Sequence, residues 1–183
     1  MTRPLNATAA SLLGFLHDGP LTGWDLVATA QQRIGDFWSL TQSQVYRELA
    51  AMAERGLVEA GERGMREKQP YTITRAGREA FASWIERLPG DETIRFPLLL
   101  TLAFGHHLST DRLATILQHH QLAHAERLRT YRLQRVEVAE LADPFALATL
   151  DFGIVYETAV LEWFEQLAVL FSDQQEGTAG PSM

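Results

Sequence analysis

The sequence predicts a mainly α-helical protein in which a winged helix-turn-helix domain precedes an all-helical C-terminal domain. Three observations predict this fold class. A capped helix is expected over residues 41–56, a short two-stranded hairpin follows it directly, and long helical periodicity dominates the chain after residue 90. A helix followed by a loop-tipped hairpin is the element order of a helix-turn-helix with a wing.

The helix expected over residues 41–56 carries the strongest local signals. Thr41 and Gln44 have the spacing of a capping box, and Gly56 stands where a helix end favours a left-handed residue. At 100° per residue, the apolar positions share one face and the polar positions share another. The apolar face holds Val45, Leu49 and Met52, and the polar face holds Gln42, Ser43, Tyr46 and Arg47.

Polar and basic side chains on this helix and on the loop over residues 61–70 indicate a DNA-binding surface. Amide, hydroxyl and guanidinium groups on a short helix face suit the major groove, and loop cations suit phosphates. The candidate contacts are Thr22, Gln42, Ser43, Gln44, Tyr46, Arg47, Arg63, Arg66 and Lys68. Gln44 has two alternatives that exclude each other, because it either caps Thr41 or reads an adenine in bidentate fashion. A solvated hairpin loop and a Tyr46 ring packed on the wing are further alternatives.

Helical periodicity and turn residues set the remaining elements. Pro89, Gly90 and Asp91 form the clearest linker, so the domains are expected at residues 1–89 and 90–172. A tail over residues 173–183, rich in Gly, Ser, Pro and Gln, is expected to be disordered. Residues 94–105 are apolar all round and are expected to be buried. Strands are expected over 57–60 and 71–74, and further helices over 6–16, 22–34, 74–88, 94–105, 109–141 and 145–172.

Composition narrows the class of protein. The 183 residues include no Cys, which excludes a disulfide framework and a thiolate metal site. Residues 1–89 hold ten basic and ten acidic side chains, so all of the net charge of −7 lies in the second half. A distant acidic domain does not prevent DNA binding, because salt screens charges beyond about 10 Å.

The longest apolar run, residues 96–105, is too short to span a bilayer, and no signal peptide is evident. A cytoplasmic protein without a membrane partner is expected.

The last helix has two apolar stripes and therefore needs two packing partners. Its first stripe follows a heptad spacing with one acidic exception, Glu157. One stripe is expected to face the chain's own helices and the other a second copy, although a central helix in a monomeric bundle is the alternative. The predicted dimer-interface residues are Leu150, Ile154, Leu161, Phe164 and Phe171.

His120, His124 and Glu157 are expected to lie on inward faces of the C-terminal helices. A buried carboxylate needs a partner, and an Arg or one of these His residues would serve. A structural role is the first interpretation, with an effector pocket near these residues, between the two halves, as the second and a metal site as the third. Trp24 and Trp38 are expected in the core or at a domain junction. No paired-carboxylate, nucleophile-base or phosphate-loop arrangement indicates an enzyme, and no cofactor or metal is expected.

The chain resembles the PadR family of bacterial transcriptional regulators, in its longer form with a full helical C-terminal domain. The similarity extends from Leu12 to Phe171. It rests on the segments over residues 12–16 and 19–26, on 37–40 with 43–49, on 54–58 and 71–78, and on 97–105 with 152–163. The sequence departs from the family pattern at Arg47, where many relatives have Pro, and this change adds a phosphate or guanine contact.

The resemblance implies a homodimeric repressor that binds a palindromic operator. It also implies that a small phenolic or other hydrophobic effector can release the DNA, since some members respond in this way. The alternative is a winged-helix protein-interaction module that does not bind DNA. The polar face of the helix over residues 41–56 and the basic loop favour the repressor.

Overall fold

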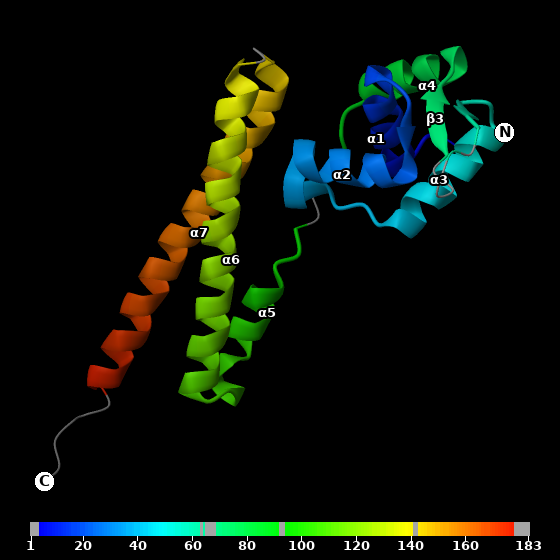
Figure 1. The fold of residues 1–183 in the computed structure, drawn as a ribbon. Helices are drawn as coiled ribbons and strands as arrows, with labels where there is room; N and C mark the ends of the chain where they lie inside the picture. Colours follow the sequence, from blue (N-terminus) through cyan, green and yellow to red (C-terminus); the bar gives the residue numbers. More distant parts are fainter. Residues whose placement is uncertain (1–3, 63, 65–68, 92–93, 141–142, 178–183) are drawn as a thin grey trace, which may run out of the picture. The chain divides into compact units, whose positions relative to one another are not determined.

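A computed structural model describes residues 4–62, 64, 69–91, 94–140 and 143–177 of the chain. The chain divides into two compact units, residues 1–91 and 92–183 (Figure 1). The division follows Asp91, whereas the boundary predicted from the sequence precedes Gly90.

The first unit combines four α-helices with a small sheet among its described residues. Three α-helices precede the hairpin and a fourth follows it, which is the order of a winged helix-turn-helix, so the predicted fold class is confirmed for this half. The elements are α1 (Ala7–Phe15), η1 (Leu16–Asp18), β1 (Leu21–Thr22), α2 (Gly23–Ile34), η2 (Gly35–Trp38), α3 (Gln42–Glu54), β2 (Val58–Ala60), β3 (Pro70–Ile73) and α4 (Arg75–Ile85).

A single hydrophobic core joins the helices of this unit to the hairpin. The predicted apolar face of α3 is confirmed, because Val45, Leu49 and Met52 are all buried in that core. They pack among residues of α1 and α2, including Leu12 and Leu26. Each large aliphatic side chain buried in this way contributes about 1.5–3 kcal/mol. The burial of one face of α3 directs its opposite face outward.

The sheet has three strands rather than the two expected from the sequence. Its order is β1-β3-β2 with antiparallel pairing throughout. In the register of the added strand, Leu21 lies opposite Tyr71 and Thr22 opposite Pro70. A two-residue strand has too few side chains for an alternating pattern, so only its pairing with β3 identifies it.

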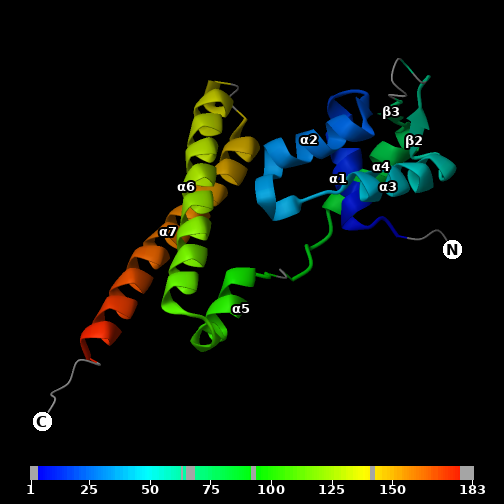
Figure 2. The same cartoon turned by 60° about the horizontal axis from the view of Figure 1, so that its bottom comes forward.

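The second unit is helical throughout its described residues. It comprises α5 (Pro97–Ala103), η4 (Gly105–His107), α6 (Thr110–Glu140) and α7 (Pro144–Gly177). Figures 1 and 2 both show α6 and α7 side by side and antiparallel. The 31 residues of α6 correspond to a helix of about 46 Å. Asp143 caps the N-terminus of α7, because its Oδ1 accepts from the backbone N–H groups of Phe145 at 3.0 Å and Ala146 at 3.3 Å.

The expected burial of residues 94–105 is wrong within the single chain. Leu98 is buried, but Leu99, Leu100 and Phe104 are exposed, and so is Ile94 before α5. A helix that is apolar all round needs neighbours on every side, whereas the other helices of one chain cover only one side of α5. The exposed side is an apolar surface that needs a further partner.

The last helix is longer than predicted and more apolar than α6. It ends at Gly177 rather than at residue 172, and residues 178–183 of the predicted tail lie outside the described residues. Among the described residues, a stretch of 24 residues, Pro144–Leu167, is long and apolar enough to cross a bilayer by length and composition alone. This stretch differs from the apolar run identified in the sequence over residues 96–105. The core helix of a soluble protein meets the same criteria.

Gly77 allows α4 to dock on the turn between α3 and β2. A Cβ at this position would lie 2.1 Å from the Leu57 carbonyl oxygen, which already accepts from the Thr74 backbone N–H at 3.1 Å. Since the obstacle is backbone, Gly77→Ala should force α4 away from the hairpin. We expect the substitution to lower the free energy of unfolding by about 1–3 kcal/mol, measured by urea denaturation.

Gly90→Ala is the matched control, because no atom lies within 4 Å of a Cβ built there. It should leave the urea midpoint unchanged. Equal midpoints for both variants would contradict the proposed role of Gly77 in docking α4.

Candidate nucleic-acid interface

The N-terminus of α3 is closed by the predicted capping box. The Thr41 Oγ1 accepts from the Gln44 backbone N–H at 3.3 Å, and the Gln44 Oε1 accepts from the Thr41 backbone N–H at 3.0 Å. At the other end, Gly56 adopts a left-handed φ of 69°. These two caps set where the exposed face of α3 begins and ends.

The cap decides between the two roles predicted for Gln44. Its Oε1 accepts from both the backbone N–H and the hydroxyl of Thr41, each at 3.0 Å. Bidentate reading of adenine needs that oxygen and the amide nitrogen together. In this conformation Gln44 is therefore a capping residue, and only its amide nitrogen is left to donate to DNA.

The remaining polar residues of α3 form an exposed face. Thr41 closes one end of it, where its Oγ1 lies 3.2 Å from the Ser43 Oγ. Among the described residues no ion pair involves Arg47, so its guanidinium is not held by a carboxylate there. We refer to this exposed face as the α3 face; it consists of Gln42, Ser43, Tyr46, Arg47 and Ala50.

Two further candidate DNA contacts, Thr22 and Tyr46, make contacts within the first unit. Thr22 caps α2, because its Oγ1 accepts from the Asp25 backbone N–H at 3.2 Å and donates to the Asp25 Oδ2 at 2.6 Å. The donor of this predicted DNA contact is therefore already used within the protein. Tyr46 reaches from α3 to the first turn of α2 and lies against Gly23, although 48% of Tyr46 remains exposed. The contact with Gly23 places the Tyr46 ring against α2, while packing on the wing stays a prediction, because residues 63 and 65–68 of the loop lie outside the described residues.

The hairpin of β2 and β3 is held together at the base of its loop. The Gly61 N–H donates to the Pro70 carbonyl at 2.8 Å, and the Gln69 side chain donates to the Gly61 carbonyl at 3.1 Å. The three loop cations predicted to contact DNA lie outside the described residues, so their role stays a prediction. They are Arg63, Arg66 and Lys68.

Trp24 and Trp38 of the first unit have different environments. Trp38 is half-buried, and its indole N–H donates to the Ser11 Oγ at 3.1 Å, which agrees with packing in this unit. Trp24 is 59% exposed, so a core position for it is wrong. Its place next to Gly23, on the outer side of the first turn of α2, explains the difference.

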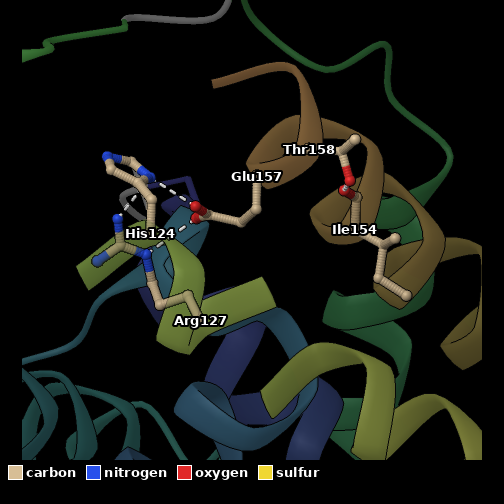
Figure 3. Close-up of polar contacts among 5 residues, drawn as sticks. All are labelled: His124, Arg127, Ile154, Glu157 and Thr158. Carbon is tan, nitrogen blue, oxygen red and sulfur yellow. Dashed lines mark hydrogen bonds and ion pairs between the residues drawn. The ribbon is translucent and has the colours of Figure 1, made fainter. Parts of the chain in front are cut away.

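A buried polar cluster joins α6 to α7 in the second unit (Figure 3). Glu157 of α7 is only 2% exposed. Its Oε2 lies 2.5 Å from the Nδ1 of His124, and its Oε1 accepts from the Arg127 Nε at 2.9 Å. The prediction that Glu157 is buried and paired with an Arg or His is confirmed. A buried carboxylate without such partners would cost several kcal/mol.

The contacts of His124 specify where its proton lies. Arg127 Nη2 is 2.8 Å from the same Nδ1 that contacts Glu157. One ring nitrogen cannot both donate and accept. The shorter contact, to a carboxylate, favours an Nδ1–H that donates to Glu157. Phe96 and Phe164 flank the ring, with centroids 5.7 Å and 5.9 Å from it. These surroundings favour a structural role for His124 and Glu157.

His120 lies one helical turn before His124 and makes none of the cluster's hydrogen bonds. Burial lowers the pKa of His120, and the nearby charges of His119, His124 and Arg127 lower it further. His120 is only half-buried. Of the three predicted effector-binding residues, His120 alone has a side chain that solvent can reach, because His124 and Glu157 are buried.

The predicted dimer seam of α7 mostly faces the chain's own helices. Leu150 and Phe164 are buried within one chain, while Ile154 and Leu161 are half-buried and the Phe171 side chain is not among those described. The heptad stripe therefore contributes mainly to the contact with α6. The apolar side chains that remain exposed lie on the outer faces of the two helices: Leu122, Leu133, Val136, Phe145, Phe152 and Val155.

A groove of about 400 Å³ runs along the side of α6 next to α7. Arg129 and Arg132 supply its charges, and Arg129 is paired with Glu126 through Nε–Oε2 at 2.9 Å. Its other lining residues are apolar: Ala125, Leu128, Leu133 and Leu161. Among the described residues, no group of three or more His, Asp or Glu side chains is placed to hold a metal ion.

Two family models match the chain, one on each unit. Residues 12–83 match the transcriptional regulator PadR-like family, and residues 94–171 match the virulence activator alpha C-terminal model. The negative transcriptional regulator PadR of Bacillus subtilis is 26% identical over 147 residues, which cover 78% of this chain and 81% of that protein.

Solved structures share the fold over most of the chain. The crystal structure of Bacillus subtilis PadR in complex with operator DNA matches with a TM-score of 0.76 and 23% identity, covering 92% of this chain and 99% of that chain. The structure of the same PadR in complex with p-coumaric acid matches with a TM-score of 0.70 and 22% identity, covering 91% and 99%.

The capped α3 with its exposed face and the hairpin beside it define a winged helix-turn-helix regulator of transcription. The two matched regions narrow this class further. Residues 12–83 form a domain of the PadR-like family of transcriptional regulators, and residues 94–171 add a helical C-terminal unit that matches the virulence activator alpha C-terminal model.

The buried cluster should contribute strongly to the stability of the second unit. Glu157→Gln removes the carboxylate that contacts both Arg127 and His124 and leaves the Arg127 guanidinium without a counter-charge. We expect a loss of about 3–5 kcal/mol in the free energy of unfolding, measured by urea denaturation with circular dichroism.

Asp151→Asn is the matched control, because it removes an exposed carboxylate that Arg135 contacts from α6. The hydrogen bond from Arg135 lowers the pKa of Asp151, yet solvent screens this pair. The control should change the unfolding midpoint little. Equal effects of the two substitutions would show that burial of Glu157 does not matter.

Proposed function

We propose that this protein is a homodimeric repressor that binds a palindromic operator through the α3 face and is released from it by a planar aromatic acid. The observation that carries the proposal is the α3 face itself. A capped helix presents amide, hydroxyl and guanidinium groups outward, in a fold shared with a PadR solved on operator DNA. Such groups contact phosphates and base edges in a major groove.

Arg47 is the residue of the α3 face best suited to read a base. Its guanidinium is exposed and can bond guanine O6 and N7 together. Arg47→Ala should weaken binding to the upstream DNA of its own gene by about 1–3 kcal/mol and relax specificity at one base pair. Fluorescence anisotropy with single-base variants of the operator measures both effects.

Arg78→Ala is a suitable control, since it removes an exposed Arg from α4, outside the α3 face. It should leave operator affinity unchanged. Wild-type protein that binds no upstream DNA would instead favour a winged-helix protein-interaction module, which the neutral charge of the first half also fits.

The dimer is proposed to form through the outer faces of α6 and α7. Phe152 is 59% exposed and Val155 68% exposed, one helical turn apart on α7. Leu133 and Val136 are similarly exposed on α6. Soluble monomers rarely expose large continuous apolar areas, so a second copy is the partner that these faces fit. A dimer also presents two recognition helices to two half-sites.

Charge placed on the outer face should separate assembly from folding. Phe152→Glu is expected to yield a folded monomer at micromolar concentration in sedimentation velocity, because a carboxylate would be buried unpaired in the interface. Phe164→Glu should instead unfold the second unit, since that side chain is buried within one chain.

Gln32→Glu adds the same charge to an exposed position of α2 and is the control. It should remain dimeric. A monomeric wild type under these conditions would refute the proposed assembly.

The effector is proposed to bind in the second unit. Two places there suit a planar aromatic acid: the surroundings of His120, and the groove where Arg132 lies beside apolar side chains. An apolar groove with a few polar groups orients small ligands. A coupling of about 1–3 kcal/mol between effector and operator would suffice for release.

Calorimetric titration distinguishes the two places. A panel of phenolic acids is titrated into wild type, His120→Ala, His124→Ala, Glu157→Gln and Arg132→Ala. We expect binding of an operator-releasing acid to weaken for the variant whose side chain meets the ligand, with folding checked by circular dichroism. Unchanged affinity in all four variants would place the effector elsewhere.

A further inference from the structure

Gly23 lies in the segment over residues 19–26, but neither the sequence patterns nor the family resemblance assigns it a role of its own. Gly23 is the first residue of α2, directly after the Thr22 cap, and it is buried. Its backbone does not require glycine, because its φ is not positive, unlike those of Gly19, Gly35 and Gly56. In a helix, glycine is less favourable than alanine by about 0.5–1 kcal/mol. The presence of glycine here therefore needs a steric reason.

Tyr46 supplies that reason. A Cβ at position 23 would lie 2.6 Å from Cε1, 2.7 Å from Cζ and 3.1 Å from the hydroxyl oxygen of Tyr46. All three atoms belong to the hydroxyl end of one ring. The end of the Tyr46 side chain that carries its polar group thus rests on the bare Cα of Gly23. Any side chain at position 23 would push that end away from α2.

The contact constrains a residue of the proposed DNA-binding surface from outside α3. Tyr46 is half-exposed and belongs to the α3 face together with Arg47. A side chain that is already held before binding loses less conformational freedom when its partner arrives. The hydroxyl can donate to a phosphate oxygen of the DNA backbone, the kind of contact that fixes the register of a protein on a duplex.

We propose that Gly23 is a positioning residue for operator binding. Because Gly23 has no side chain, the hydroxyl end of the Tyr46 ring packs against its Cα, and this contact holds the Tyr46 hydroxyl in place for a phosphate of the DNA backbone. The proposal rests on the proposed function, since it concerns how the α3 face meets DNA. Gly23 acts through Tyr46 and itself contacts no DNA in this scheme.

A double-mutant cycle tests the proposal. Operator affinity is measured by fluorescence anisotropy for wild type, Gly23→Ala, Tyr46→Ala and the double variant, and also for Tyr46→Phe. Gly23→Ala and Tyr46→Phe should each weaken binding by about five- to tenfold. In the Tyr46→Ala background, Gly23→Ala should have no further effect, because the displaced ring is gone.

Gly90→Ala, which adds the same methyl group where no atom is near, should bind operator as wild type does. Because Tyr46 can swing outward into solvent, Gly23→Ala should keep its unfolding midpoint. If Gly23→Ala does not fold, the double variant provides the readout: recovery of folding supports the steric contact, and failure of the double variant to fold overturns it.

Two negative results have different meanings. If wild type binds operator and Gly23→Ala weakens binding equally with and without the Tyr46 ring, Gly23 acts by another route and the inference is overturned alone. If wild type binds no upstream DNA at all, the proposed function fails and the inference falls with it.

Discussion

The fit of α3 into the core of the first unit is the constraint on which the rest of this protein depends. Val45, Leu49 and Met52 are buried together with residues of α1 and α2, and a helix has no freedom to rotate once one face is packed. The capping box at Thr41 and the left-handed Gly56 set the length of the helix. The polar face that the regulator presents is the geometric complement of this buried face.

In the second unit, buried polar side chains help to fix how the two long helices pack. Its two long helices pack through apolar rows, but Glu157 stands in the middle of the row on α7 and is almost completely buried. His124 and Arg127 of α6 supply both of its oxygens with partners. The cluster favours the observed register of α6 against α7, since sliding either helix by a turn would break the contacts of Glu157 with both His124 and Arg127. The cluster thus specifies the helix pairing that the apolar rows alone would leave less certain.

Each unit lacks one thing: the first has no excess of positive charge, and the second has no cover for its exposed apolar side chains. The first exposes a polar face without an excess of positive charge, because its acidic and basic residues balance. The second exposes apolar side chains on α5, α6 and α7 that one chain does not cover. A dimer would cover the apolar surface and double the number of weak DNA contacts, so affinity would come from paired half-sites and less from bulk electrostatics.

The sequence by itself determined the winged helix-turn-helix order, Thr22 and Thr41 as the cap residues of α2 and α3, the buried face of α3 and the burial of Glu157. These features depend on local signals, namely capping residues, helical periodicity and a charge within an apolar row. Only the tertiary structure decided that Gln44 caps α3, that Leu150 and Phe164 face α6, and that Trp24 and most of α5 are exposed. It also revealed β1 and the packing of the Tyr46 ring against Gly23. Periodicity shows which residues share a face, but which neighbour covers that face depends on contacts between distant segments.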